Sequence, residues 1–298
     1  MDHNLHYDYF RKLTFDKLCK DYELFYFIHK NPNISEPVTL SKKISKRLSV
    51  EIKLFKLSTR NNEFFKYLAN RFLSVFFGKF KKIYDQDKLK HIDRHFAKLA
   101  SVLPKITKNI YYIDNINNQK SLIEKLGPDL MVIVGAPFIN KNITSLNFRK
   151  INLHIGYLPN YRGIKTIEWA ILNNEFDKVG YSIHELTNEL DSGAVISKKA
   201  LVIDENNINL NNIYVDLYES AFLDLIQLLK HGVPSPNQNS NTNFKAYYSY
   251  SFNPLNYKKL IQKKTRLAIF VGNPVQYHIP IYKALSLENN LDLIVMFG

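Results

Sequence analysis

The chain has 298 residues, of which 45% are hydrophobic and 13% aromatic, a composition that excludes an intrinsically disordered protein. The start, MDHNLHYDYF, has no apolar signal region and no run of 18 apolar residues follows, so we expect a cytoplasmic protein without a membrane span. Cys19 is the single cysteine, which excludes an intrachain disulfide framework and a cysteine-based metal site. No metal is expected.

The formal net charge of +14 is concentrated in the first third of the chain. Residues 1–108 contain 23 Lys and Arg against 11 Asp and Glu, a net charge of +12. A basic segment suits anionic partners such as RNA, acidic lipid or a nucleotide diphosphate. The alternative, which we favour for most of these residues, is that the lysines keep an aromatic-rich surface soluble.

The N-terminal part reads as the opening of a parallel α/β sheet. Residues 23–29 are β-prone and precede a turn-like Asn-Pro-Asn at 31–33. Residues 39–49 carry an apolar residue every fourth position, which predicts a helix. Residues 50–58 alternate apolar and polar side chains, which predicts a second strand. Neither predicted strand is followed by a glycine-rich loop, so a dinucleotide-binding fingerprint is absent.

Residues 62–100 form a long segment in which aromatic and basic residues alternate at helical spacing. Its apolar positions are Phe64, Phe65, Leu68, Phe72, Val75, Phe76 and Phe80. Such a helix either packs across the sheet as part of the core or lies on an acidic membrane surface. We favour core packing, because apolar stripes on helices usually face a core.

From residue 109 the pattern is that of a Rossmann-like α/β domain, with a mostly parallel sheet flanked by helices. A strand at 109–117 leads to a short helix closed by Gly127 and to a buried apolar strand at 128–136. The later elements are a helix at 166–175, strands at 178–186 and 193–203, a long amphipathic helix at 211–233 and a polar loop at 235–243. His184, on the first of these later strands, is interpreted as a structural residue rather than a second base.

Residues 151–193 carry the candidate chemistry. In an extended segment residues i and i+2 project to the same face, so Asn152 and His154 can aim two donors at one volume. Two convergent donors are what an oxyanion needs when an acyl carbonyl becomes tetrahedral. Asp191 could hold the imidazole protonated and orient a water. Each residue alone has an ordinary structural explanation, but the set indicates acyl transfer to an amine.

Three motifs in this segment resemble the formyltransferase signature. They are Asn152-x-His154, then Leu158-Pro159-x-Tyr161-Arg162-Gly163, and then Glu189-Leu190-Asp191-Ser192-Gly193. The family includes methionyl-tRNA formyltransferase, glycinamide ribonucleotide formyltransferase, sugar N-formyltransferases and formyltetrahydrofolate hydrolase. The resemblance is clear over residues 109–235 and weak from 20 and to about 255. One departure is that Ile155-Gly156 follows His154, where Pro-Ser is common in the family.

The resemblance implies roles for individual residues. Asn152, His154 and Asp191 correspond to the family's catalytic triad, and Tyr161, Arg162 and Gly163 are expected to contact substrate. The cofactor implied is 10-formyltetrahydrofolate. Its pterin is expected to lie against the loop Gly135-Ala136-Pro137-Phe138-Ile139 and against the segment from Leu186 to Leu190, where backbone groups pair with its edge and apolar side chains cover its faces.

The last stretch, residues 256–298, reads as strand, turn, helix and strand. A single βαβ unit cannot bury its faces alone. This one resembles the first unit of a glycosyltransferase, with a Gln-Tyr-His-x-Pro turn that contains Tyr277 and His278. We therefore predict a formyltransferase-like domain at 1–255, with a diverged basic half at 1–108 and a motif-bearing half at 109–235, and a truncated second domain at 256–298. The alternative is an ordinary C-terminal cap on the first domain.

The expected reaction is transfer of a formyl group from 10-formyltetrahydrofolate to the amine of a nucleotide-linked amino sugar. A fused glycosyltransferase would consume such a sugar, and cations in the basic half suit its diphosphate. The alternatives are a methionyl-tRNA formyltransferase, a formyltetrahydrofolate hydrolase, and a module that binds a nucleotide sugar or RNA without turnover. Nucleic acid is the less favoured partner, and contact with a membrane surface remains open.

Overall fold

The structure is a computed structural model that describes residues 5–29, 40–106, 108–205, 208–236, 244–261, 265–271 and 291–297. Within these residues the helices are α1 (Leu5–Leu18), α2 (Leu40–Arg60), α3 (Phe64–Ser101), α4 (Lys120–Leu126), α5 (Lys141–Thr144), α6 (Thr166–Leu172), α7 (Leu210–His231) and α8 (Pro254–Ile261). Single 3₁₀ turns are η1 (Ile116–Asn118), η2 (Phe176–Lys178) and η3 (Ser249–Ser251). The strands are β1 (Tyr26–His29), β2 (Ile110–Ile113), β3 (Leu130–Val134), β4 (Arg149–His154), β5 (Arg162–Gly163), β6 (Gly180–Glu185), β7 (Val195–Ala200), β8 (Ala246–Tyr247), β9 (Thr265–Val271) and β10 (Leu291–Phe297).

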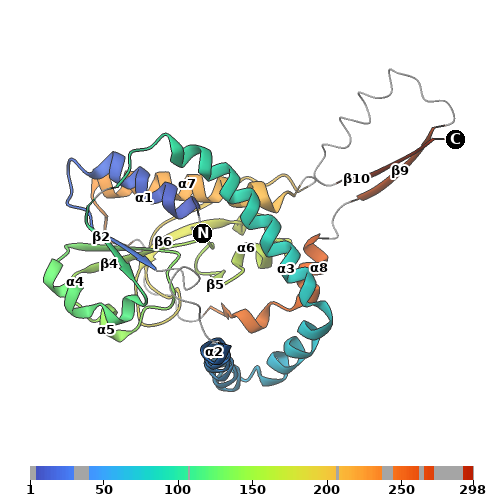
Figure 1. The fold of residues 1–298 in the computed structure, drawn as a ribbon, viewed down its shortest axis with the longest axis horizontal. Coiled ribbons are helices and arrows are strands. Elements are labelled where there is room, and N and C mark those ends of the chain that lie inside the picture. The colour runs from blue at the N-terminus through green and yellow to red at the C-terminus, as the bar shows by residue number, and fades with distance from the viewer. Residues whose placement is uncertain are drawn as a thin grey trace.

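A four-stranded sheet in the order β3-β4-β6-β7 forms the centre of the main body. β3 and β4 run parallel, whereas β4 with β6 and β6 with β7 run antiparallel. The pairs β1–β2, β5–β8 and β9–β10 are all parallel. Figure 1 shows α1 and α7 on one side of the central strands, α4 and α5 at one end, and α3 crossing diagonally. The predicted α/β class with mostly parallel strands is confirmed.

Helix α7 shows how the sequence specifies one of these elements. The Asn209 side chain accepts hydrogen bonds from the Asn211 and Asn212 N–H groups at the first turn, and the helix ends at Gly232 with φ 86°. Its buried residues recur at helical spacing and include Ile213, Leu217, Ala221, Phe222 and Leu225. They pack with strands β4 and β6 in the main core cluster, where each fully buried large side chain stabilises the fold by roughly 1.5–3 kcal/mol.

The predicted strand at 50–58 is wrong, because these residues continue α2. The sequence Val-Glu-Ile-Lys-Leu-Phe-Lys-Leu-Ser alternates like a strand, but its apolar positions also recur every three or four residues from Leu48 onward, so both periods fit. The partner of β1 is β2 instead, in parallel register from Tyr26 opposite Ile110 to His29 opposite Ile113. The predicted parallel opening therefore exists, with α2 and α3 together forming its crossover. The Asn-Pro-Asn turn at 31–33 lies outside the described residues.

Helix α3 divides into two halves with different environments. In the second half Tyr84, Ile92, Phe96 and Ala100 are buried, and Ile92 and Phe96 belong to the main core. In the first half five apolar residues are exposed, namely Phe65, Leu68, Phe72, Val75 and Phe76. The prediction that the whole apolar stripe packs as core is wrong for this first half, because nothing in the spacing of a stripe says which surface covers it.

A buried ion cluster fixes the second half of α3 to α6 and α7. Glu168 on α6 is fully buried and accepts from the Tyr84 hydroxyl at 3.0 Å, the Lys88 Nζ at 3.2 Å and the Tyr214 hydroxyl at 2.7 Å. Lys165 Nζ lies 3.4 Å from the same carboxylate and 2.8 Å from Asp85. The cluster joins three helices through charges and hydrogen bonds that are largely removed from water.

Strands β9 and β10 form a two-stranded parallel sheet in the predicted order, from Leu291 opposite Thr265 to Phe297 opposite Val271. The turn and helix predicted between them, with Tyr277 and His278, lie outside the described residues, and most of the polar loop at 235–243 does too. The domain boundary at 255 and the glycosyltransferase resemblance remain predictions. In the part of the chain that the structure describes, no helix combines the length and apolar character needed to cross a membrane.

Candidate active site

Strand β4 carries both predicted donors. Asn152 and His154 are two positions apart on this strand, so their side chains leave the same face. In the antiparallel pairing with β6, Asn152 lies opposite His184 and His154 lies opposite Ser182. His154 is buried and Asn152 half-buried. The register therefore brings a second histidine beside the two donors.

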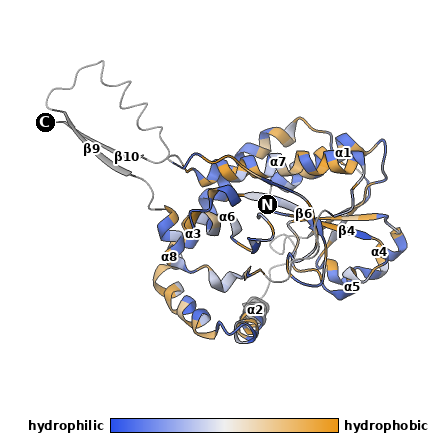
Figure 2. Cartoon of the chain, turned by 180° about the vertical axis from the view of Figure 1, so that it is seen from behind, coloured by the Kyte–Doolittle hydropathy of each residue, from blue (hydrophilic) through white to orange (hydrophobic). Residues whose placement is uncertain are grey.

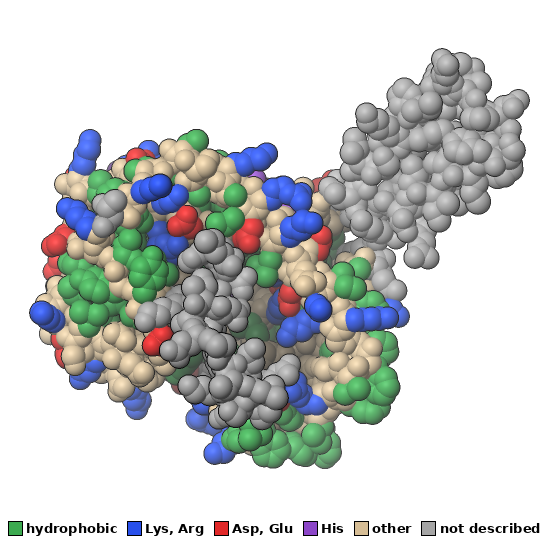
Figure 3. All heavy atoms as spheres, viewed as in Figure 1, with side chains coloured by type: hydrophobic (Ala, Val, Ile, Leu, Met, Phe, Trp, Pro, Cys, Tyr) green, Lys and Arg blue, Asp and Glu red, His purple; other side chains and the backbone are tan. Residues whose placement is uncertain are grey.

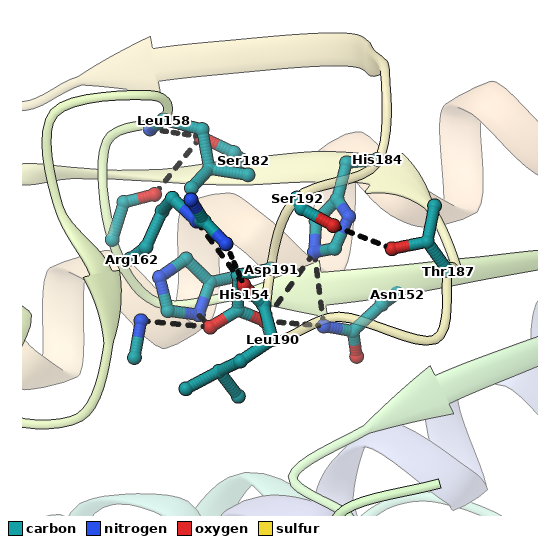
Figure 4. A network of polar contacts seen from close by, with 12 residues as sticks. Asn152, His154, Leu158, Arg162, Ser182, His184, Thr187, Leu190, Asp191 and Ser192 are labelled. Carbon is teal, nitrogen blue, oxygen red and sulfur yellow. Dashed lines mark hydrogen bonds and ion pairs between the residues drawn. The ribbon is translucent and has the colours of Figure 1, made fainter. Parts of the chain in front are cut away.

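The loop after β6 returns Asp191 to the same place. Asp191 has φ 45°, a left-handed conformation that aspartate adopts more readily than most residues. Its Oδ2 lies 3.5 Å from His154 Nδ1, and its Oδ1 accepts from Asn152 Nδ2 at 3.5 Å. The Gly163 N–H donates to Oδ2 at 2.8 Å. Figure 4 shows the three side chains converging, so the structure brings the predicted triad together.

The surroundings keep the Asp191 carboxylate ionised. Burial alone would raise the pKa of Asp191, but the charges of His154 and His184, the hydrogen bond with His184 and the Gly163 N–H outweigh burial and lower the pKa to about 2. A carboxylate with so low a pKa stays negative at any neutral pH. It therefore acts as a fixed negative charge beside both imidazole rings.

The His154 ring lies between two acceptors. Its Nε2 lies 2.9 Å from the Tyr161 carbonyl oxygen, which can only accept, so Nε2 carries a hydrogen. Its Nδ1 faces the Asp191 carboxylate at 3.5 Å, a second acceptor. The ring with a single hydrogen on Nε2 donates to Tyr161 alone, whereas the ring with hydrogens on both nitrogens faces an acceptor at each. The contact to Asp191 is longer than an ordinary hydrogen bond.

Sequence reasoning missed the direct contact of His184 with this cluster. Its Nδ1 lies 2.8 Å from the Glu185 carbonyl oxygen, so Nδ1 carries a hydrogen. Its Nε2 lies 3.1 Å from Asn152 Nδ2 and 3.6 Å from Asp191 Oδ1. In the neutral ring Nε2 accepts from Asn152, and in the charged ring it donates to Asp191. The sequence does contain a signal for this contact. Ser182 and His184 are two positions apart on their strand, as Asn152 and His154 are on theirs, so each pair projects from one face.

Gly156 makes room for the His154 imidazole. A Cβ atom at position 156 would lie 2.2 Å from His154 Nε2 and 2.7 Å from the Tyr161 carbonyl oxygen. Ser182 fixes the same turn, because its hydroxyl donates to the Gly156 carbonyl and accepts from the Leu158 N–H, both at 2.9 Å. Gly156 belongs to the Ile155-Gly156 pair that differs from the Pro-Ser common in the formyltransferase family. At this position a side chain would occupy the space that the His154 ring needs to reach the Tyr161 carbonyl.

The predicted substrate segment 161–163 holds the Asp191 loop in place. Arg162 is buried, and its Nε and Nη2 donate to the Leu190 carbonyl at 3.1 and 2.8 Å while Nη1 donates to the Phe244 carbonyl at 2.8 Å. Tyr161 is buried with its hydroxyl bonded to Glu175 and Asn173. These contacts are internal to the fold. Contact of Tyr161, Arg162 and Gly163 with substrate remains a prediction.

The predicted pterin loop lies at the carboxyl edge of the sheet. It follows β3, and because β3 and β4 are parallel it is beside the end of β4 that carries His154. Residues 135–138 are exposed, whereas Ile139 is buried in a smaller apolar cluster that Leu186 packs against. The Asn117 side chain fixes the loop, donating to the Phe138 carbonyl at 2.9 Å and accepting from the Asn140 N–H at 2.8 Å.

Helix α1 borders this loop. Gly135 has φ 62°, and a Cβ there would lie 2.0 Å from the Tyr7 hydroxyl oxygen of α1, so the N-terminal helix closes one side of the loop. A cavity of about 510 Å³ lies elsewhere, lined by residues such as Glu124, Asp129 and Phe148, and contains no member of the triad. Among the described residues, no group of three or more His, Cys, Asp and Glu is arranged to hold a metal ion.

Residues 89–220 match the family model described as formyl transferase. The chain contains a formyl transferase domain. The matched residues run from the second half of α3 into α7 and include Asn152, His154 and Asp191.

Curated relatives of this domain match part of the chain. The chain is 31% identical over 148 residues to the bifunctional polymyxin resistance protein ArnA of Wigglesworthia glossinidia brevipalpis. This match covers 45% of this chain and 22% of that protein. It is 35% identical over 117 residues to methionyl-tRNA formyltransferase of Sulfurihydrogenibium sp. (strain YO3AOP1). This match covers 38% of this chain and 37% of that protein. The chain thus spans less than half of the length of both relatives.

Solved structures with formyl transferase domains are similar at low identity. A sugar N-formyltransferase from Shewanella sp FDAARGOS_354 is 21% identical, with a TM-score of 0.42 and coverage of 70% of this chain and 82% of that chain. The formyltransferase PseJ from Anoxybacillus kamchatkensis, in complex with UDP-4,6-dideoxy-4-formamido-L-AltNAc and tetrahydrofolate, is 21% identical, with a TM-score of 0.40 and coverage of 50% of this chain and 85% of that chain.

Proposed function

We propose that this domain transfers a formyl group from 10-formyltetrahydrofolate to the amine of a nucleotide-linked amino sugar. The observation that carries the proposal is the convergence of Asn152, His154 and Asp191, with the Asp191 carboxylate 3.5 Å from both the Asn152 amide nitrogen and His154 Nδ1. Two donors held against one buried carboxylate are suited to a carbonyl oxygen that gains negative charge.

The residues at the carboxyl edge fit a folate. The exposed loop 135–138 presents backbone groups and the Phe138 side chain, which is 59% exposed. Asn117 holds this loop through the Phe138 carbonyl and the Asn140 N–H, so the surface is built before a ligand arrives. Planar heterocycles bind where a few fixed polar groups border an apolar surface. Phe138 and the backbone of 135–137 would hold the pterin, with Leu186 and Leu190 on the opposite side.

10-Formyltetrahydrofolate supplies an activated formyl group at this edge. The Asn152 Nδ2–H and the His154 imidazolium would donate to the formyl oxygen. Each would do so in place of its 3.5 Å contact with Asp191. Asp191 would hold His154 in its charged form and orient a water that carries away the proton that the amine loses as its nitrogen bonds to the formyl carbon. The bond from that carbon to the folate nitrogen breaks, and the folate nitrogen takes up a proton.

Two features support an amino sugar on a nucleotide as the acceptor. The C-terminal strands β9 and β10 are parallel, as the first βαβ unit of a nucleotide-sugar-consuming glycosyltransferase requires. The net charge of +12 in residues 1–108 suits a diphosphate.

A second candidate is formylation of methionyl-tRNA. Several curated relatives bear that name, including proteins from Flavobacterium johnsoniae and Clostridioides difficile. The basic first third of the chain also suits RNA, whose binding weakens steeply with salt. The acceptor therefore has to be identified by experiment.

The test is release of tetrahydrofolate from 10-formyltetrahydrofolate by the purified full chain, with a panel of nucleotide-linked amino sugars, methionyl-tRNA, or buffer alone. The variants are Asn152→Ala and His154→Ala, and His231→Ala at the exposed end of α7 is the matched control. We expect turnover only with an amino sugar, lost in both site variants and kept in the control.

Other outcomes would overturn the proposal in different ways. Turnover only with methionyl-tRNA would establish the second candidate, and turnover in buffer alone would indicate a hydrolase. No turnover with any acceptor by a folded chain would indicate a binding module. Full activity in His154→Ala would remove the triad assignment itself.

A further inference from the structure

The first half of α3 exposes an apolar stripe. The exposed fractions are 83% for Phe65, 44% for Leu68, 65% for Phe72, 79% for Val75 and 60% for Phe76. Their spacing of three, four, three and one residues places them along one face of the helix. Figure 2 shows the hydrophobic colouring of this part of α3. Single exposed apolar residues are ordinary on a protein surface, but a contiguous row with three phenylalanines marks an interaction site.

The opposite face of the same helix half is already used inside the protein. Tyr67 and Asn70 are buried, the Tyr67 hydroxyl donates to Glu51 on α2 at 2.9 Å, and the Asn70 amide donates to the Tyr250 carbonyl. Tyr67 lies two residues after Phe65, and two residues on a helix are about 200° apart. The exposed stripe is therefore the face left over after α3 has packed.

The helix beside α3 is apolar on its surface too. The α2 residue Phe55 packs edge-on against Phe64 at 5.6 Å between ring centroids. Leu48, Ile52 and Phe55 of α2 are themselves exposed. In the space-filling view hydrophobic side chains gather at the lower rim, over α2 and the first half of α3, with Lys and Arg side chains beside them (Figure 3).

The charges that this part of α3 itself contributes have one sign, with Lys66 paired to Glu63 and Arg71 to Glu51 of α2. Residues 64–84 contain five cationic side chains and no Asp or Glu; the cations are Lys66, Arg71, Lys79, Lys81 and Lys82. Lys79, Lys81 and Lys82 are exposed, and Lys79 Nζ lies 5.5 Å from the centroid of the Phe80 ring. A partner for this face has to be apolar where it meets the phenylalanines and negative where it meets the lysines.

We propose that the first half of α3 docks on an anionic lipid bilayer. In an amphipathic helix lying in the interface plane, the apolar face enters the boundary of the acyl chains while cations meet lipid phosphates. Phe65, Phe72 and Phe76 supply the first contact, and Lys79, Lys81 and Lys82 the second. A second copy of the chain fits less well, because the two stripes would bring cations of the same sign together.

The buried ion cluster at Glu168 makes such docking a property of the whole domain. Asp85 and Lys88 follow the basic stretch directly and join α3 to Lys165 and Glu168. Helix α3, which would meet the lipid, is thus fixed to α6 and α7, which pack beside the four-stranded sheet that carries Asn152 and His154. Binding would hold the formyl transferase domain at the membrane surface. This inference does not depend on which amine the domain formylates.

The test measures binding of the full chain to sedimented vesicles of phosphatidylglycerol and phosphatidylcholine, and to vesicles of phosphatidylcholine alone. We expect binding to the anionic vesicles only, weakened by added salt. Phe72→Ser with Phe76→Ser should reduce affinity by roughly tenfold or more per phenylalanine. Lys79→Glu with Lys81→Glu and Lys82→Glu should reduce it by roughly fivefold or more per lysine.

Matched controls lie elsewhere on the surface. Val102→Ser with Val202→Ser alters apolar residues that are 83% and 102% exposed, and Lys120→Glu with Lys125→Glu reverses exposed charges on α4. Both controls should bind vesicles like the parent chain. The lysine variant changes only exposed charges and is expected to fold normally. It therefore tests the proposal even if the phenylalanine variant fails to fold.

Four outcomes would overturn the proposal. The first is no binding of the parent chain to anionic vesicles. The second is equal binding by the parent and both α3 variants. The third is a parent dimer in sedimentation equilibrium that the phenylalanine variant converts to monomer, which would assign the stripe to a second copy. The fourth is binding to tRNA that displaces the chain from vesicles and is equally strong in the phenylalanine variant. That result would assign the basic residues to RNA.

Discussion

The ring of His184 lies against the amide of Asn152, with 3.1 Å between Nε2 and Nδ2. The two residues are directly opposite one another on β6 and β4. His184 is itself fixed by the Glu185 carbonyl, 2.8 Å from Nδ1. A backbone carbonyl thus sets the tautomer of a buried ring, and the ring orients the amide proposed to contact the formyl oxygen. His184 is therefore a positioning residue.

Replacing His184 should lower turnover more than it lowers substrate affinity. His184→Phe removes the acceptor of the Asn152 amide, and we expect kcat to fall roughly ten- to a hundredfold, the range for residues that orient a catalytic group. KM for both substrates should change little. His184→Gln retains an acceptor and should restore part of kcat. Steady-state kinetics with both substrates provides the measurement.

The control for this prediction is the neighbour on the same strand. Ile183 is fully buried and faces away from the site, so Ile183→Val should cost about 1 kcal/mol of stability with kcat preserved. If His184→Phe and Ile183→Val reduced kcat equally, His184 would have no role beyond packing.

Neutralising Asp191 should abolish most activity while the fold survives. Asp191→Asn keeps the side-chain shape but removes the charge that faces His154 and His184 at 3.5 and 3.6 Å. We expect kcat/KM to fall roughly a hundredfold or more, the scale of a lost acid–base or electrostatic group. Asp177→Asn, at an exposed position of η2, is the matched control. Activity of Asp191→Asn near that of the control would exclude the carboxylate from the reaction.

A side chain at Gly156 should displace the His154 imidazole. In Gly156→Ala the new methyl group would lie 2.2 Å from His154 Nε2, so the ring must leave the Tyr161 carbonyl. We expect a large loss of kcat together with a changed ¹H–¹⁵N signal of the His154 ring. Gly78→Ala is the control, because no atom lies within 4 Å of its Cβ position; a helical alanine there should raise stability by about 0.5–1 kcal/mol. An unchanged ring signal in Gly156→Ala would contradict the steric argument.

The parts predicted from sequence are those that local spacing determines. Asn152 and His154 had to share a face once the segment was extended, and Asp191 followed from the order of the motifs. The His184 contact depends on which residue of β6 faces Asn152, and strand register is a tertiary property. The strand predicted at 50–58 failed because its alternation also fits a helix. The exposed stripe of α3 was assigned to the core because a pattern of apolar residues does not identify what covers it.

The Glu168 cluster should dominate the stability of the helical layer. Glu168 is completely buried and meets Lys88 and Lys165 at 3.2 and 3.4 Å. Glu168→Gln removes the carboxylate that Lys88 contacts and leaves Lys165 with Asp85 alone, and removal of one partner from a buried ion pair typically costs about 3–5 kcal/mol. Urea denaturation at neutral pH should show this loss as a lower midpoint. Glu124→Gln is the control: its pair with Lys120 is about half exposed on both sides, so the change should stay within about 0.5 kcal/mol.

The same carboxylate should give the fold an acid-sensitive component. Burial would raise the pKa of Glu168, but Lys88, Lys165 and the Tyr214 hydroxyl lower it from 4.5 to about 2. Because the folded pKa lies below the unfolded one, the stabilisation is present above about pH 4.5 and is lost as the pH falls toward 2. The parent chain should therefore lose stability across this window, and Glu168→Gln should lose less because Asp191, with a pKa of about 2, then contributes most of the remaining slope. Equal slopes for the parent and Glu168→Gln would show that Glu168 is not held ionised by its two lysines.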